Sequence, residues 1–508
     1  MHRRPDPLSA LSLAMVPVAL CLLGCPQFID KGSDAGPEAK SDAGEELDAG
    51  TPDAGALDAG TADAGLPDAS LADAGEDAGI DACVPLTCEL APGACGELPD
   101  GCDGVVSCAC DFAHTCGVSG ANACGCADEK WALKYVDRGA NVGRHSSMAR
   151  DPQGALHVVY ADANLGLKHA VIPRGETFAT SLEHIDADAD ATDSTIAIDA
   201  SGTLHVAYYR WVHISGTLWE TDLWYAQKPA GGEWSRELVI DAGEPCYVNG
   251  GGAVLRLDPS GGVHVFFTYW YYDGADYRHA ARLGPETWDI YPVFAGDRLG
   301  GSTRVTAGVP AFAVGPDGTL HAAFEYYRGG ELHYATRPPQ GDWTVHEELI
   351  AVPGEGLLQA MGMSAVMEAD ARGVHIAFWS WLDSSSSDLR YGFLPAGGGA
   401  WTVETIPPSP GETAVVAGAE ALSIDAEGGV HLLFQDNGTG WLNHAFRKEA
   451  GGWEVTVIDR SGNGGYETAL LAEPDGLHVS YYEQGPMSGP DYTGKLRYAY
   501  RCRTSAGP

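Results

Sequence analysis

Basic residues are scarce in this chain of 508 residues, which has 30 Lys and Arg against 70 Asp and Glu and a formal net charge of −40. A protein of this charge lacks the basic face that binds nucleic acid, so nucleic acid is excluded as a partner. The GxSxG, HExxH, P-loop and strand–helix GxGxxG fingerprints are also missing. The sequence therefore predicts no catalytic residue, metal site or cofactor.

The N-terminal apolar stretch, residues 8–23, is too short to span a bilayer, and it follows Arg3 and Arg4. It ends in Leu-Leu-Gly-Cys25, which resembles a bacterial lipobox. The resemblance implies that residues 1–25 are a signal peptide cleaved before Cys25, whose thiol is lipidated. Because Pro26 replaces the Asp of the inner-membrane retention signal, we expect a lipid anchor in the outer membrane. The alternative is an ordinary secretory signal cleaved nearby.

Residues 26–82 have almost no aromatic side chains, Phe28 excepted, and cannot bury a core. Asp-Ala-Gly recurs through this stretch, which is predicted to be a disordered, low-complexity acidic spacer. Residues 83–126 hold nine of the 13 Cys and are predicted to be a small module held together by disulfides. Because the spacing of these Cys is not CxxC…CxxC, structural zinc is the less favoured alternative.

One motif recurs seven times after residue 150, an Asp-x-x-Gly or Pro-Asp-Gly turn followed by a strand that begins His-apolar-x-aromatic. Successive copies of the His are 47 to 59 residues apart. The copies are His157, His205, His264, His321, His375, His431 and His478. This period with short strands is typical of a β-propeller, so residues 127–508 are predicted to form seven blades of four strands, a to d.

The seventh unit lacks its fourth strand, because the chain ends soon after strand c at 496–501. A matching stretch, Trp131–Asp137, stands before the first unit. We therefore predict an all-β, seven-bladed propeller in which this N-terminal strand closes the last blade. Cys502 would begin the missing hairpin, and we predict that it forms a disulfide with Cys126 or with Cys124, which closes the ring covalently. Cys246 is left over.

The seven His residues lie on strand b of different blades and cannot converge on one metal ion. Each is expected to bond to backbone or to the next blade, as buried polar groups must. Function is expected instead where the copies differ, in the unequal and aromatic b–c segments, which share one face with the d–a connections. Aromatic rings flanked by charged groups suit sugars. The candidate ligand-binding residues are Trp211, Trp219, Trp270, Tyr271, Tyr272, Tyr327, Arg328, Trp379, Trp381 and Tyr482.

The repeats resemble those of secreted bacterial propellers of the sialidase-like BNR (Asp-box) type. The Asp-box itself, Ser-x-Asp-x-Gly-x-x-Trp, is not matched, because His-Val-x-Tyr stands where its Trp would come. The resemblance implies three arginines on a substrate carboxylate, and the arginines available are Arg144, Arg210, Arg278, Arg304 and Arg328. Similarity to propeller polysaccharide lyases implies a His, a Tyr and an Arg on one face, for which His213, Tyr272 and Arg328 are the candidates.

The sequence thus favours a monomeric outer-membrane lipoprotein whose propeller binds a glycan or a cell-surface protein without catalysis. A glycan-degrading enzyme of sialidase or polysaccharide-lyase type, using the same face, is one alternative. A structural envelope protein is the other.

Overall fold

The computed structural model describes short stretches between residues 85 and 126 and most of residues 130–503. The longest gaps in the latter range are 242–251, 296–309, 351–364 and 412–418. The predicted signal peptide, Cys25, the spacer and Cys246 lie outside the described residues. Among the residues that are described, no helix is long and apolar enough to cross a membrane.

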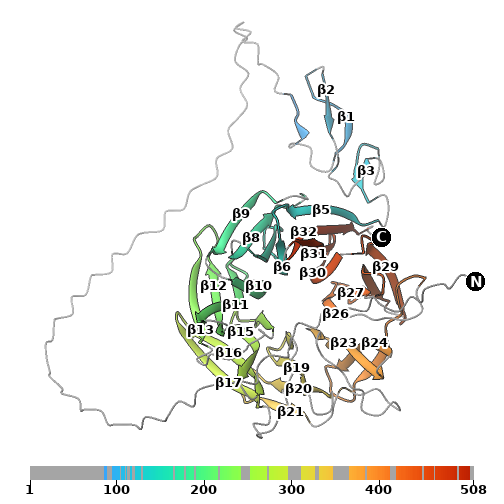
Figure 1. Ribbon diagram of the computed structural model, residues 1–508. Coiled ribbons are helices and arrows are strands. Elements are labelled where there is room, and N and C mark those ends of the chain that lie inside the picture. The colour runs from blue at the N-terminus through green and yellow to red at the C-terminus, as the bar shows by residue number, and fades with distance from the viewer. Residues whose placement is uncertain are drawn as a thin grey trace, which may run out of the picture. The chain divides into compact units, whose positions relative to one another are not determined.

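The described part of residues 130–503 forms seven antiparallel four-stranded sheets arranged around an axis, as Figure 1 shows. This confirms the prediction of an all-β, seven-bladed propeller. From the axis outward, blade one is β6 (Val142–Arg150), β7 (Leu156–Asp162), β8 (Gly166–Ile172) and β9 (Ser181–Asp186). Blade two is β10 (Asp190–Ile198), β11 (Leu204–Ser215), β12 (Leu218–Lys228) and β13 (Ser235–Ile240).

The middle blades repeat this order. Blade three is β14 (Ala253–Leu257), β15 (Val263–Tyr271), β16 (Gly274–Gly284) and β17 (Thr287–Ala295). Blade four is β18 (Ala311–Val314), β19 (Leu320–Tyr326), β20 (Glu331–Arg337) and β21 (Thr344–His346). Blade five is β22 (Ala365–Asp370), β23 (Gly373–Asp383), β24 (Ser386–Pro395) and β25 (Thr402–Thr405). Blade six is β26 (Ala419–Ile424), β27 (Val430–Asp436), β28 (Trp441–Arg447) and β29 (Trp453–Asp459).

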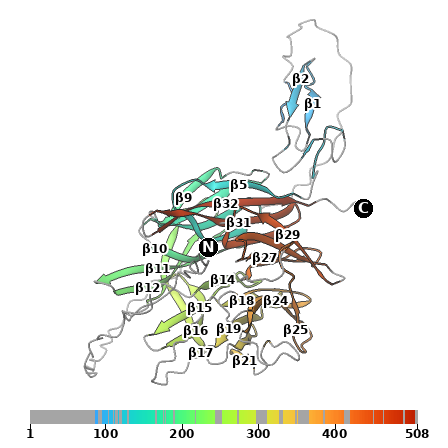
Figure 2. The ribbon, with the colours of Figure 1, turned by 45° about the vertical axis from the view of Figure 1, so that its right-hand side comes forward.

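Blade seven is built from both ends of the propeller chain. Its strands are β30 (Gly464–Glu473), β31 (Gly476–Ser488), β32 (Asp491–Cys502) and the N-terminal β5 (Ala132–Asp137). Strand β5 pairs with β32 from Leu496 opposite Asp137 to Tyr500 opposite Ala132, and the two strands lie side by side in Figures 1 and 2. The predicted closure by the 131–137 segment is confirmed.

The junction between blades seven and one is also closed by a covalent bond and by close packing. Cys126 and Cys502 form a disulfide with a Cα–Cα distance of 5.9 Å, which is the first of the two predicted pairings. Gly143 of β6 has a φ of +106°, and a Cβ added there would lie 2.6 Å from the Cα of Leu496 on β32. Only glycine accommodates both the backbone angle and this approach.

The hydrophobic core lies between blades rather than at one centre. One cluster joins Val142 and Tyr160 of blade one to Leu496 and Tyr498 of blade seven. Each blade thus buries its apolar faces against its two neighbours, which explains why strands b read as continuous apolar runs after the His. The segment before the propeller has the short strands β1 (Gly96–Pro99), β2 (Val105–Cys108), β3 (Thr115–Cys116) and β4 (Cys124–Gly125).

Candidate functional site

In blades one, two, three, five, six and seven a turn Asp lies within 3.5 Å of Nε2 of the His on strand b. Blade one shows the arrangement. Oδ1 of Asp151 accepts the backbone N–H groups of Gln153 and Ala155 at 2.9 and 2.8 Å. Oδ2 of Asp151 lies 3.2 Å from Nε2 of His157. One carboxylate therefore shapes the turn and orients the imidazole, which explains why Asp-x-x-Gly and His recur together.

The second ring nitrogen of each of these His residues bonds to strand c of the same blade. Nδ1 of His157 lies 2.9 Å from Nε2 of His169, and Nδ1 of His205 lies 2.6 Å from the hydroxyl of Tyr225. The prediction of partners in the backbone or in the next blade is therefore wrong, because strand c is the hydrogen-bonded neighbour of strand b and offers its own Tyr or His. The remaining pairs are His264–His279, His321–Tyr334, His375–Tyr391, His431–His444 and His478–Tyr498. These residues form the frame of the blades.

A different group of charged residues lies at the axis, where the inner strands of blades seven, one and two begin. Nδ1 of His145 on β6 lies 3.2 Å from Oδ1 of Asp193 on β10. Nε2 of His145 lies 3.8 Å from Oε1 of Glu467 on β30. The imidazole thus bridges two carboxylates from the neighbouring blades, and we call these three residues the axial cluster. It lies at the end of the propeller that carries the b–c hairpins and d–a connections, the b–c face.

The three members of the axial cluster share an unusual backbone conformation. His145, Asp193 and Glu467 have φ values of 51°, 51° and 53°, in the left-handed region that disfavours side chains. Each lies at a break in the pairing between its inner strand and strand b. Hydroxyls hold the bulges in place, because Ser194 donates to the carbonyl of His145 at 2.6 Å and Ser146 donates to that of Glu467 at 2.9 Å. The same local strain, repeated in three adjacent blades, aims three charged side chains at one point.

The two carboxylates keep the imidazole charged. Burial opposes the imidazolium, but the charges of Glu467 and Asp193, together with the hydrogen bond to Asp193, overcome it and raise the pKa of His145 to about 9. The side chains remain partly open, with exposed fractions of 22% for His145, 18% for Asp193 and 32% for Glu467. At neutral pH the cluster therefore presents two carboxylates and one imidazolium at the b–c face.

Tyr482, predicted as an exposed aromatic platform, is only 2% exposed, so that prediction is wrong. Its hydroxyl donates to Oδ1 of Asn141 at 3.1 Å, and the guanidinium of Arg144 lies over its ring at 5.5 Å from the centroid. The ring of Tyr482 lies against Gly494. A Cβ at position 494 would come within 2.1 Å of the ring, so a larger residue does not fit at this position. Tyr482 thus supports Arg144, the neighbour of His145, from inside the junction between blades seven and one.

The other predicted ligand-binding residues have different outcomes. Trp211 on β11 and Trp379 on β23 are half-buried, and Nε1 of Trp211 donates to the hydroxyl of Thr192 at 3.3 Å. Trp219, Trp270, Tyr271 and Trp381 lie on described strands, but their side chains are outside the described part. Tyr272, Tyr327 and Arg328 lie outside the described residues altogether. The idea of an aromatic binding face therefore stays a prediction.

Two of the arginines suggested by the sialidase resemblance contact residues of their own blades. Arg210 lies over the ring of Trp224, and Arg278 lies over Tyr269 and 3.3 Å from Asp276. Arg304 and Arg328 are outside the described residues.

The axial cluster was not predicted, although the repeats contain a signal for it. His145, Asp193 and Glu467 each stand six positions before the turn residues Asp151, Asp199 and Glu473. Blade three has glycine at the same position, Gly252. When the repeats are aligned on the first residue of the turn, His145, Asp193 and Glu467 fall at the same position of their inner strands.

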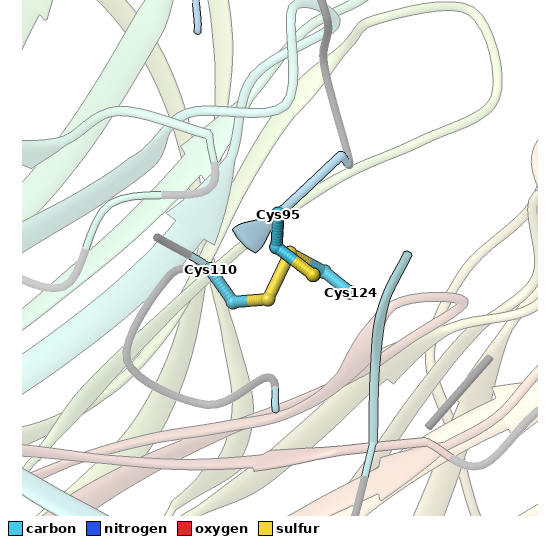
Figure 3. A group of neighbouring side chains, drawn as sticks. All are labelled: Cys95, Cys110 and Cys124. Atoms are coloured by element: carbon cyan, nitrogen blue, oxygen red, sulfur yellow. A yellow bond between two sulfur atoms is a disulfide. The ribbon is translucent and has the colours of Figure 1, made fainter. Parts of the chain in front are cut away.

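Three cysteine sulfur atoms also lie close together in the cysteine-rich segment, where the sulfur atoms of Cys95, Cys110 and Cys124 are within 4.8 Å of one another (Figure 3). Cys110 and Cys124 are bonded to each other, as Cys88 is to Cys108, and Cys95 is also disulfide-bonded. Sulfur atoms in disulfides are not the thiolates that bind zinc, so this group is part of the predicted disulfide framework.

No protein-family model matches the chain, and no curated protein is similar to it in sequence at a significant level. A protein of unknown function from Dyadobacter fermentans has a similar structure, with a TM-score of 0.42, 13% identity and coverage of 74% of this chain and 98% of that one. An α-L-arabinanase from Penicillium chrysogenum gives a TM-score of 0.39, 12% identity and coverage of 72% and 94%. The polysaccharide lyase Uly1 gives a TM-score of 0.37 and 12% identity, with coverage of 60% of this chain and 89% of that one. At these identities the likeness extends to the propeller fold alone.

Proposed function

We propose that the propeller binds a glycan on its b–c face without cleaving it. The axial cluster carries this proposal, because Asp193 and Glu467 are partly open carboxylates held in place by a charged imidazole. Fixed carboxylates accept hydrogen bonds from sugar hydroxyls, and such charge-assisted bonds are the stronger kind. The half-buried Trp211 and Trp379 belong to strands that run to the same face and supply apolar surface for sugar rings.

The pairing of the cluster favours binding over hydrolysis. A glycosidase needs one carboxylic acid that donates a proton and a second carboxylate that acts as base or nucleophile. In the axial cluster both carboxylates share one imidazolium, and a carboxylate paired with a cation is a poor proton donor. The arrangement suits a fixed, ionised recognition site.

We also propose that a lipid anchor holds the propeller at the outer membrane. The lipobox-like Leu-Leu-Gly-Cys25 and the acidic Asp-Ala-Gly spacer support this proposal. A spacer whose like charges repel one another keeps its two ends apart, so a ring-shaped binding domain would reach ligands away from the lipid surface. Metabolic labelling with a clickable fatty acid tests the anchor, and a Cys25→Ser chain that still incorporates the label would overturn it.

The glycan proposal is tested by applying the purified whole chain to an array of glycans and to immobilised cell-surface proteins. We expect selective binding to one glycan class, with Asp193→Asn and Glu467→Gln each lowering affinity by at least about tenfold, the effect of losing a charged hydrogen bond. Lys448→Gln, at a surface pair with Glu454, is the matched control that leaves binding unchanged. Binding only to proteins, or to nothing, would overturn the proposal and favour the protein-binding or the structural reading.

Glycan degradation is the second candidate, and the grouping of Arg144, His145 and Tyr482 favours it. These are the residue types that the lyase similarity implies, now found at the axis rather than at His213, Tyr272 and Arg328. A lyase needs a neutral base, whereas the pKa of His145 is about 9. Incubation with uronate-containing polysaccharides separates the two functions. Unsaturated products absorbing in the ultraviolet, or new reducing ends, would establish catalysis.

A further inference from the structure

Three cations surround one aromatic ring on the outermost strand of blade seven. The ring is that of Tyr135 on β5. The guanidinium carbons of Arg138 and Arg497 lie 5.1 and 4.7 Å from its centroid, and Nζ of Lys495 lies 5.4 Å from it. The three side chains come from the d–a connection and from β32, so they meet at the rim of the b–c face. We call Tyr135, Arg138, Lys495 and Arg497 the rim cluster.

One cation of the rim cluster makes ion pairs with described residues, and the other two make none that the structure describes. Arg497 pairs with Asp459 at 2.9 Å and with Glu483 at 3.1 Å. Arg138 and Lys495 are both exposed and lie against the ring of Tyr135.

Strand β31 connects the rim cluster to the axial region. Glu483, whose carboxylate accepts the hydroxyl of Tyr135 at 2.9 Å, directly follows Tyr482, which supports Arg144. Glu483 also lies opposite Lys495 in the sheet. Blade seven therefore contributes to both clusters at the same end, with Glu467 of the axial cluster on its inner strand β30 and Tyr135 of the rim cluster on its outer strand β5.

We infer that the rim cluster is an anion-binding subsite for a sulfate or phosphate ester on the glycan bound at the b–c face. This inference rests on the proposed function. Arginine offers paired N–H donors that match an oxyanion, lysine adds a compact charge, and the ring of Tyr135 holds both in place. The net charge of −40 repels dense polyanions, so the fitting ligand is a mostly neutral glycan with isolated ester groups.

The test measures binding of the purified whole chain to immobilised dextran that is unmodified, lightly sulfated or lightly phosphorylated. We expect the ester-bearing dextrans to bind at least about fivefold more tightly than the unmodified one, an advantage that weakens with salt. Arg138→Gln and Lys495→Gln should each remove most of this advantage. Arg174→Gln, an exposed arginine beyond the end of β8, is the matched control and should leave it intact.

Glu483→Gln distinguishes an anion-binding role of the rim cluster from a purely structural one. The substitution keeps the hydrogen-bonding shape but removes the charge that competes for Arg497, so binding of the ester-bearing dextrans should become tighter. An equal loss in Arg174→Gln, or no change in Arg138→Gln and Lys495→Gln, would overturn the inference. If glycan binding depends on Asp193 and Glu467 but not on esters, the proposed function stands and the rim subsite fails. If only the ester dependence is found, the rim subsite stands and the axial site fails.

Discussion

The ring of Trp131 packs edge-on against the ring of His444, with centroids 5.5 Å apart and planes inclined by 72°. Trp131 directly precedes the borrowed strand β5 of blade seven, and His444 lies on strand c of blade six. The same contact joins strand c of one blade to the aromatic residue at the start of strand d in the next blade elsewhere in the ring. The equivalent pairs are His169–Trp234, Tyr225–Trp288, His279–Trp343, Tyr334–Trp401 and Tyr391–Trp453. The borrowed strand thus reproduces the contact made by strands that follow their hairpins directly.

Trp131→Ala should therefore weaken closure of the ring. We expect a loss of about 2 to 3 kcal/mol in the free energy of unfolding, at or below the low end for a buried Trp because Trp131 is only half-buried. Denaturant unfolding followed by fluorescence measures it. Trp453→Ala, which removes the same contact inside a continuous blade, is the matched control and should cost a similar amount without separating β5 from the sheet. If β5 amides keep full protection from hydrogen exchange in Trp131→Ala, the closure role is contradicted.

Replacing both cysteines of the Cys126–Cys502 bond with Ser should lower the free energy of unfolding by about 2 to 5 kcal/mol. The bond joins residues 376 apart in sequence, so its loss frees a long loop in the unfolded chain. The measurement is denaturant unfolding of the double variant. Cys110→Ser with Cys124→Ser opens a bond that spans 14 residues and lies outside the blades, and it should leave the propeller transition unchanged. A double variant at 126 and 502 as stable as the parent would refute the role of the bond.

The His pairs predict that the propeller loses stability in acid. In blade three, Arg337 donates to Nδ1 of His279 at 3.2 Å, Nε2 of His279 lies 3.0 Å from Nδ1 of His264, and Nε2 of His264 lies 3.3 Å from Asp258. This chain of bonds needs both rings neutral. Burial, the neighbouring His264 ring and the charge of Arg337 together lower the pKa of His279 to about 2. The unfolded ring binds a proton near pH 6.5, so stability is complete above that pH and falls as the pH drops toward 2.

His279→Tyr should reduce this loss, because blades two, four, five and seven already pair their His with Tyr. The tyrosine hydroxyl can bond to His264 without binding a proton itself. We expect the variant to match the parent at pH 8 and to exceed it between pH 4 and 6 in thermal melts. Tyr334→His in blade four is the reciprocal control and should make acid unfolding easier. Parallel pH profiles for parent and variant would contradict the assignment.

The repeated residues, but not the axial site, could be predicted from the sequence. Blade number, strand order, the borrowed β5 strand and the Cys502 bond follow from copies that agree, because equivalent residues in a ring make equivalent contacts. The partners of the seven His residues were missed because a repeat pattern does not show which neighbour a side chain faces. Tyr482 was misplaced because its burial depends on Gly494, Asn141 and Arg144 at the junction of two blades. The axial cluster depends on three bulges, which single repeats do not reveal.

For His145 we predict that stability depends on pH with the opposite sign to that of the His pairs. The pKa of His145 is about 9 in the folded protein, above the ordinary value of 6.5, so its contribution is complete below pH 6.5 and disappears as the pH rises through 9. His145→Gln should therefore cost about 2 kcal/mol of unfolding free energy at pH 6, with partial exposure limiting the effect, and almost nothing at pH 10. Unfolding titrations across this range measure it.

Asp193→Asn serves as the partner variant, because it removes one of the two carboxylates that hold the imidazolium. Its free energy of unfolding should likewise approach that of the parent above pH 9. Glycan affinity should follow the same titration, since a neutral His145 no longer balances the two carboxylates or fixes their positions. If His145→Gln differs from the parent by a constant amount from pH 6 to pH 10, the axial cluster is held by packing rather than by charge. The proposed recognition site would then lose its electrostatic basis.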